Sequence, residues 1–326
     1  MVPLILPVPY VYQYGSPWCG PASTAMILKY FGEELNYWEI AEVLKIGRDS
    51  DLSIKDSREY IKGHNDLNVG SKRSWYWRSI FEWRGLKSYL VSSLDSGAPV
   101  FLKIPTTKKR NNERLSHAVV IVGYIYNPDI SFYVNDPSGA LFESLNLTYK
   151  YRAIIAKPVD GNKLNDLCKG GNLVEAFKVS GKPNPPNGTL LFGDRSCLIL
   201  GNDGFTYHTW LDDGLKWKET SSNNLFPIEH PIPYYSSKYE IIQFNIEIAN
   251  QRNFEQQYLV NITDESNLVL VSERFTVGPF NNIRAPRIDL YPVPMAKGPH
   301  LVYVKLLDLD NKLVDQIGPL AINVVG

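Results

Sequence analysis

The stretch Ser16-Pro17-Trp18-Cys19-Gly20-Pro21-Ala22-Ser23 places one cysteine between a tight turn and an amphipathic segment. Apolar residues at helical spacing predict a helix from about Gly20 to Tyr30, ended by Gly32. A thiol at the start of a helix meets the positive end of the helix dipole, which favours the reactive thiolate. Because the flanking glycine and proline do not suit simple core packing, we interpret Cys19 as a nucleophile rather than a small buried apolar residue.

Three further residues follow the order that a cysteine nucleophile requires. Gln13 lies six residues before Cys19, His117 opens an apolar strand about a hundred residues later, and Asp136 ends the next strand. A histidine can act as the base for a thiol, and a carboxylate can orient the imidazole ring. The Gln13 amide, together with the Cys19 backbone N–H, can donate to a developing oxyanion.

Each of these residues also has a purely structural interpretation. His117 could be a satisfied histidine at a sheet edge, and Gln13 could be an ordinary surface residue. Asp136 lies in Asn135-Asp136-Pro137-Ser138-Gly139, which is good turn chemistry. Strand alternation should point Asn135 away from Asp136, so Asp136 is the better orienting group. The four residue types in this order favour the catalytic interpretation.

These residues resemble the papain-like cysteine peptidases, and within them the group similar to the double-glycine leader peptidases that process bacteriocins. The short span from Cys19 to His117, and aspartate where papain has asparagine, favour that group. The resemblance covers about residues 5–157 and implies thiol hydrolysis of a peptide bond without metal or cofactor. It does not extend to the leader-peptide substrate. The matching segments are Gln13, residues 18–23, residues 117–124 and residues 136–137.

Residues 1–157 read as one α+β domain, with a helical half followed by an antiparallel sheet half. Capping residues and glycine stops predict helices over residues 20–30, 36–44, 53–61 and 74–83, the last ended by Gly85. Short apolar runs bounded by turn residues predict strands over residues 99–104, 117–126, 132–135 and 151–156.

The remainder of the chain reads as β structure. We interpret residues 158–235 as a β-rich connector, with turn material at residues 159–162 and hairpins over residues 188–201 and 204–217. Residues 236–326 alternate in short strands separated by turns, which predicts an immunoglobulin-like β-sandwich. We expect this sandwich to position substrate or to bind a protein or surface partner.

Composition limits the classes of partner. Of 326 residues, 34 are Lys or Arg and 34 are Asp or Glu, so the net charge of zero gives no support for nucleic acid or an anionic membrane. No apolar run approaches the length of a membrane span, and we expect none. The other histidines, His64, His208, His230 and His300, have no companions at metal-ligand spacing, so we expect no metal and no cofactor.

Location and cysteine pairing stay open at this stage. Three glycosylation sequons, at Asn146, Asn187 and Asn261, give weak support for secretion. We expect a secreted or cell-surface protein, with a cytoplasmic location as the alternative. Cys168 and Cys197 could form a disulfide in an oxidising compartment or remain inert thiols.

Two other functions fit part of the pattern. The same catalytic groups could perform amide transfer, isopeptide cleavage or hydrolysis of cell-wall peptides. A non-catalytic surface or assembly protein could use the papain-like domain as a scaffold. Such a scaffold would not need Gln13, Cys19, His117 and Asp136 together, so we expect a thiol hydrolase acting on a peptide or protein substrate.

Overall fold

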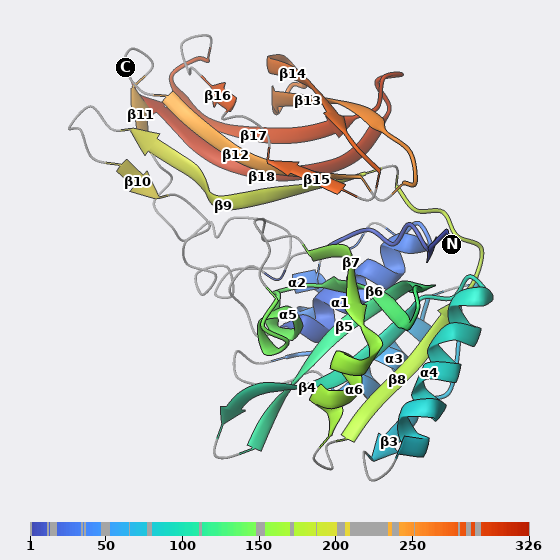
Figure 1. Ribbon diagram of the computed structural model, residues 1–326. Coiled ribbons are helices and arrows are strands. Elements are labelled where there is room, and N and C mark those ends of the chain that lie inside the picture. Colours follow the sequence, from blue (N-terminus) through green and yellow to red (C-terminus); the bar gives the residue numbers. More distant parts are fainter. Residues whose placement is uncertain are drawn as a thin grey trace. The chain divides into compact units, whose positions relative to one another are not determined.

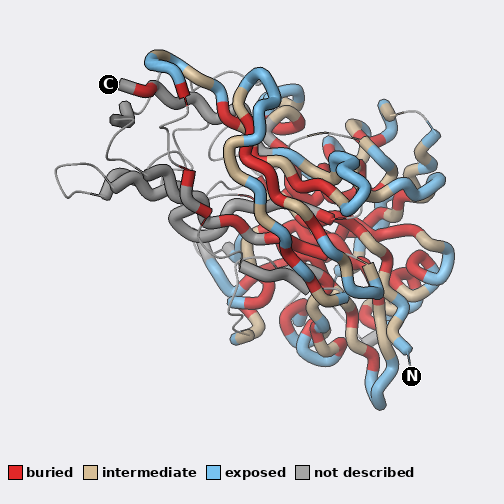
Figure 2. The backbone as a smooth tube through the Cα atoms, turned by 90° about the horizontal axis from the view of Figure 1, so that it is seen from above, coloured by how far each residue is buried: buried red, intermediate tan, exposed pale blue. Residues whose placement is uncertain are grey.

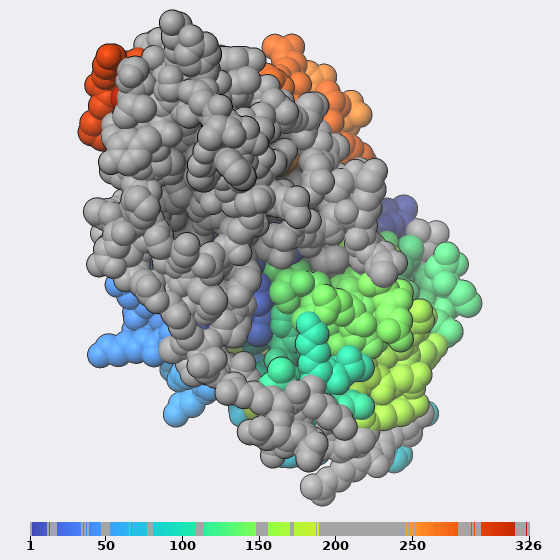
Figure 3. All heavy atoms as spheres, turned by 90° about the vertical axis from the view of Figure 1, so that its left-hand side faces the viewer, coloured from blue at the N-terminus to red at the C-terminus, as the bar shows by residue number. Residues whose placement is uncertain are grey.

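A computed structural model of the chain divides into two compact units. The first comprises Met1–Gln13 and Pro17–Pro185, and the second comprises Tyr14–Ser16 and Pro186–Gly326. Residues outside the described ranges are drawn in grey in Figure 3. The structure describes residues 2–11, 13, 18–33, 35, 37–46, 53–64, 66–76, 80–110, 113–147, 154–169, 173–186, 188–200, 206–208, 234–236, 241–250, 252–279, 281–284, 288–290 and 295–325.

After β1, the two-residue strand Leu4–Ile5, three helices follow one another in the first unit. α1 spans Cys19–Tyr30 and stops before Gly32, whose φ of 93° is a left-handed conformation that suits glycine. α2 spans Tyr37–Val43 and α3 spans Ile54–Lys62. The Ser53 hydroxyl caps α3 by accepting a backbone N–H of its first turn. These elements confirm the first three predicted helices.

The strands of the first unit form one antiparallel sheet among the described residues. Its order is β2-β8-β4-β5-β6-β7, with β1 paired to β5 and β3 paired to β8 (Figure 1). The unit therefore combines helices with an antiparallel sheet, as an α+β fold requires. The strand bounds are β1 Leu4–Ile5, β2 Asn68–Val69, β3 Arg73–Tyr76, β4 Val100–Arg110, β5 Glu113–Tyr126, β6 Ile130–Asp136, β7 Ile154–Asp160 and β8 Leu173–Ser180.

The helix predicted over residues 74–83 was wrong. Arg73–Tyr76 is β3, and α4 spans Ile80–Asp95, straight through Gly85. A Cβ on Gly85 would lie 3.0 Å from the Trp75 indole nitrogen, so this glycine allows β3 to approach the helix rather than ending it. The helix continues because its later apolar residues bury one face, namely Leu86, Tyr89, Leu90 and Leu94.

The first unit extends past residue 157, where the sequence predicted its end. The segment predicted as a turn at residues 159–162 instead finishes β7 and starts α6, Gly161–Cys168. The Asp160 carboxylate caps this helix by accepting the backbone N–H groups of Asn162 and Lys163. β8 then inserts into the sheet beside β4, which ties residues 173–180 to the first unit.

β5, the central strand, is buried on both faces. Residues 119–122 have no exposed surface, although their side chains alternate between the two sides of the sheet. α1, α4 and α5, a short helix at Ala140–Ser144, all contact β5. The buried residues form continuous tracts through the strands (Figure 2). His117 and Ala118 lie in the same strand, directly before this buried stretch.

The second unit contains two sheets of five strands each among its described residues. One sheet runs β10-β9-β12-β15 with β16 also paired to β12, and the other runs β11-β18-β17-β13-β14. All pairs are antiparallel except β11 with β18. The strand bounds are β9 Thr189–Leu200, β10 Thr206–His208, β11 Tyr234–Ser236, β12 Ile241–Asn250, β13 Gln256–Asp264, β14 Val269–Val277, β15 Asn281–Arg284, β16 Ile288–Leu290, β17 Gly298–Leu307 and β18 Leu313–Val325.

Part of the predicted connector belongs to this unit. Residues 189–200 form one continuous strand, not the predicted hairpin, and they pair with β12. Apart from β10, the hairpin predicted over residues 204–217 lies outside the described residues. The immunoglobulin-like arrangement of residues 236–326 stays a prediction. None of the described helices has the length and apolar character needed to span a membrane.

Candidate active site

Cys19 is the first residue of α1, with no side-chain cap on the preceding Trp18. The helix packs against β5, and this contact brings the Cys19 sulfur to the strand. The backbone N–H of Ala118 donates to Cys19 Sγ at an N–S distance of 3.4 Å. Cys19 is partly accessible, whereas Cys168 is buried. The predicted nucleophile therefore lies at a helix start, beside the strand that carries His117.

His117 lies between Cys19 and Asp136. Its Nε2 atom is 2.6 Å from Asp136 Oδ1, and both side chains are buried. The Cys19 side chain also lies near enough to the His117 ring to raise the pKa of the imidazole. β5 holds the histidine opposite Ile104 of β4, and β6 brings Asp136 to the ring from the other side. The structure thus brings together three of the four residues singled out in the sequence.

Backbone amides hold the Asp136 carboxylate in place. Its Oδ1 accepts the N–H groups of Ser138 and Gly139, at 3.2 and 2.9 Å. Its Oδ2 accepts those of Leu141 and Phe142, at 2.9 and 3.4 Å. These donors belong to the turn after β6 and the first residues of α5, so the carboxylate caps that helix while it contacts His117. Asp136 therefore has one defined orientation.

Charge interactions and hydrogen bonds affect the pKa values of His117 and Asp136 more strongly than burial does. Burial disfavours a charged imidazole, but Asp136 and Cys19, through charge and hydrogen bonds, raise the pKa of His117 to about 10. Burial alone would raise the pKa of Asp136. The charge and hydrogen bond of His117 and the amides of Ser138 and Gly139 instead lower that pKa below its ordinary value. These contacts therefore favour the charged forms of both His117 and Asp136.

Gln13 reaches the same region through its backbone. The N–H of Gln13 donates to Pro137 O at 3.0 Å, directly after Asp136, and its side chain is buried. Asn135 points away from His117, as strand alternation predicted. Its amide nitrogen donates to Val8 O, and its oxygen accepts the N–H of Ala156. Asn135 thus supports the neighbouring chain segments and leaves the imidazole to Asp136.

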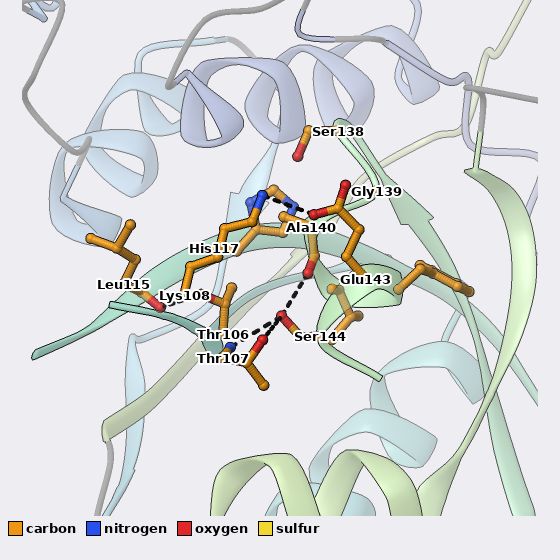
Figure 4. A network of polar contacts seen from close by, with 12 residues as sticks. Thr106, Thr107, Lys108, Leu115, His117, Ser138, Gly139, Ala140, Glu143 and Ser144 are labelled. Carbon is orange, nitrogen blue, oxygen red and sulfur yellow. Dashed lines mark hydrogen bonds and ion pairs between the residues drawn. The ribbon is translucent and has the colours of Figure 1, made fainter. Parts of the chain in front are cut away.

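A polar network below His117 was not foreseen from the sequence. Ser144 Oγ, in α5, accepts the backbone N–H of Thr107 at 3.1 Å and donates to Ala140 O at 2.7 Å (Figure 4). Thr107 lies in the stretch of β4 where pairing with β5 is irregular, so its N–H needs another acceptor. Lys108 pairs with Glu143 at 2.8 Å beside it. The network fastens α5, and hence the amides around Asp136, to the sheet.

The remaining predictions about reactive side chains concern the other two cysteines and a possible metal site. Cys168 is a free thiol at the end of α6, and burial raises its pKa above the ordinary range. It therefore resembles an inert buried cysteine, the second of the two alternatives. Cys197 lies in β9. Among the described residues no group of three or more His, Cys, Asp or Glu side chains could hold a metal ion.

Comparison with solved structures gives only weak similarity, and no curated protein matches the chain. A glycosyl hydrolase family 2 member from Bacteroides cellulosilyticus is 10% identical, with a TM-score of 0.23, over 77% of this chain and 27% of that one. Beta-glucuronidase 2 from Bacteroides uniformis is 9% identical, with a TM-score of 0.25, over 78% and 26%. A beta-galacturonidase from Eisenbergiella tayi is 9% identical, with a TM-score of 0.26, over 79% and 36%.

This chain therefore spans about a quarter to a third of the length of those proteins. TM-scores of this size carry no argument about fold or function. The family comparison covers the region of the site itself. Residues 5–157 match the model of the Peptidase_C39 like family, which supports a papain-like cysteine peptidase in this part of the chain.

Proposed function

We propose that the first unit is a thiol hydrolase that cleaves peptide bonds with Cys19 as nucleophile. The observation that carries the proposal is the position of His117. Its Nε2 atom lies 2.6 Å from the Asp136 carboxylate, and the Cys19 side chain lies near enough to raise the pKa of the ring. A nucleophile, a base and an orienting acid in contact form the arrangement that covalent acyl transfer needs.

The reaction begins when the Cys19 thiolate attacks the carbonyl carbon of the scissile bond. The carbonyl oxygen becomes an oxyanion, which the Gln13 amide and the Cys19 backbone N–H stabilise. The protonated His117 then gives its proton to the leaving amine, and the C–N bond breaks to leave a thioester on Cys19. Water, deprotonated by the now neutral His117, attacks the thioester. The C–S bond breaks, the acid product leaves, and the Cys19 thiolate and the protonated His117 are restored.

Asp136 has the role of keeping His117 charged and correctly turned. The raised pKa of His117, about 10, means that the ring carries its proton before substrate arrives. The proton is then ready for the leaving amine. Because four backbone amides hold the carboxylate, the ring has a fixed partner throughout the cycle. Specificity for a double-glycine sequence is not part of this proposal.

The second unit has a supporting role in this proposal. We assign it an immunoglobulin-like sandwich that positions a peptide or protein substrate or holds a partner at a surface, in a secreted or cell-surface protein. The alternation of residues 236–326 is the basis for this assignment. Deletion of the first unit should leave partner binding intact and abolish cleavage.

The test is cleavage of a mixed peptide library by the full chain, read by mass spectrometry. The expected result is a set of cleaved bonds that vanishes in Cys19→Ala and persists in Cys168→Ala, the matched control for an unreactive thiol. Addition of a free amine shows whether water or the amine resolves the thioester. Equal cleavage by Cys19→Ala and the parent would contradict the proposal, and so would a library left intact by the parent.

A further inference from the structure

The residues before Gln13 form a lead-in segment, residues 4–13, that is fastened to the sheet at several points. Among the described residues of this segment only Leu4 and Ile5 are in a strand, so the position of the other described residues depends on individual hydrogen bonds. One bond meets Val122 of β5, and the other three meet consecutive residues at the end of β6 and directly after it, Asn135, Asp136 and Pro137. The bonds are Leu6 N to Val122 O at 2.7 Å, Asn135 Nδ2 to Val8 O at 3.0 Å, Tyr10 Oη to Asp136 O at 2.9 Å and Gln13 N to Pro137 O at 3.0 Å.

Tyr10 makes the bond with the most direct link to the site. Its side chain has no exposed surface, and neither does Asp136. Water therefore cannot replace this bond if it is lost. The phenol donates to the main-chain oxygen of Asp136, while the side chain of that residue holds His117. One residue of the turn thus contacts both the lead-in segment and the catalytic histidine.

We propose that Tyr10 is a positioning residue for Gln13, and this inference rests on the proposed function. Gln13 follows Tyr10 by three positions, a span of about 10 Å of extended chain, so an anchor at Tyr10 limits where Gln13 can lie. The Gln13 N–H bond to Pro137 O provides the second anchor. Together they fix the donor amide relative to Asp136 and the charged His117.

An oxyanion donor works only when it lies about 2.7–3.1 Å from the developing charge. Removal of such a donor lowers kcat by about 10²–10³-fold. Tyr10→Phe keeps Gln13 but removes one of its anchors, so we expect a smaller loss, about 10-fold in kcat. KM should stay within about twofold, because the anchor acts when the oxyanion forms and not when substrate binds.

Alkylation of Cys19 separates this role from a structural one. Iodoacetamide reacts with the thiolate by displacing iodide, and no oxyanion forms. Tyr10→Phe should therefore alkylate with the same pH profile as the parent, which also shows that the site has folded. A shifted profile would mean that Tyr10 acts through Asp136 and His117 instead, and would overturn the proposal.

The decisive experiment is a double-mutant cycle on a fluorogenic peptide built from a bond that the parent cleaves in the library. We expect Tyr10→Phe to lower kcat about 10-fold in the parent and to have no effect in Gln13→Ala. Tyr30→Phe is the matched control, because Tyr30 is also buried and its phenol donates to a backbone oxygen, that of Gly97, in the same unit. It should keep the parent kcat.

Two results would overturn the role of Tyr10: an equal loss in the Gln13→Ala background, or no loss in the parent. A Gln13→Ala variant with full kcat would overturn it as well, while the roles of Cys19, His117 and Asp136 would stand. Failure of the proposed function has a different signature, because Cys19→Ala would then cleave the peptide as fast as the parent.

Discussion

Replacement of Asp136 by asparagine probes the centre of the site with a change of one atom. The carboxylate accepts five hydrogen bonds, three at Oδ1 and two at Oδ2. In Asp136→Asn the side-chain amide can be turned in two ways, and in both of them its NH₂ group, which is a donor, faces other hydrogen-bond donors. If it takes the Oδ2 position, the backbone N–H groups of Leu141 and Phe142 lose their acceptor. At about 1–3 kcal/mol for each buried unsatisfied group, the free energy of unfolding should fall by about 2–6 kcal/mol.

The same change should impair the reaction. Without the carboxylate, burial prevails and the pKa of His117 falls from about 10. In a serine triad the equivalent change lowers kcat by about 10⁴-fold, and we expect a loss of that order here.

Urea unfolding followed by tryptophan fluorescence measures the first effect, and peptide cleavage measures the second. Asp136→Glu retains the charge and controls for it. An asparagine variant with the stability and kcat of the parent would refute this account of Asp136.

Three further predictions follow from individual contacts. A Cβ on Gly123 would lie 2.2 Å from Leu4 O, so Gly123→Ala must displace β1 and should lower the free energy of unfolding by about 1–3 kcal/mol; an unchanged urea midpoint would contradict this. Ser144→Ala removes the acceptor of the Thr107 N–H and should lower the free energy of unfolding by about 1–3 kcal/mol. A variant as stable as the parent would show that the network of Figure 4 does not contribute to stability. The pKa of His117 is raised from 6.5 to about 10, so its contribution to stability is complete below about pH 6.5 and is lost as the pH rises through about 10. Between these pH values the urea midpoint of the parent should therefore fall more than that of His117→Gln. An equal fall of the midpoint with pH in both proteins would contradict this prediction.

The residues of the site could be predicted from sequence because each has a local signature. Cys19 is the first residue of a helix, His117 directly precedes the buried apolar run of β5, and Asp136 is the last residue of β6. The sequence also indicated which side Asn135 faces, since alternation in a strand is a local property. Their approach to one another depends on α1 packing against β5, which only the fold displays.

The rest depends on partners that are distant in sequence. Tyr10 and Asp136 are 126 residues apart, and nothing around Tyr10 marks it as a donor to that turn. Gly85 carries the usual signal of a helix end, yet Trp75 fills the space beside it and the helix continues. β8 joins the sheet through pairing with β4, so the extent of the first unit could not be predicted from local composition.

The most direct test of the central claim is the pH dependence of Cys19 alkylation by iodoacetamide, in the parent and in His117→Ala. Labelling is scored on the Cys19 peptide alone by mass mapping, with the buried Cys168 as an internal reference. The account predicts fast labelling at about pH 6 that is lost in His117→Ala, as a thiolate–imidazolium pair requires. Labelling that rises only near pH ~8.5, the ordinary value for a thiol, and is indifferent to His117 would contradict it.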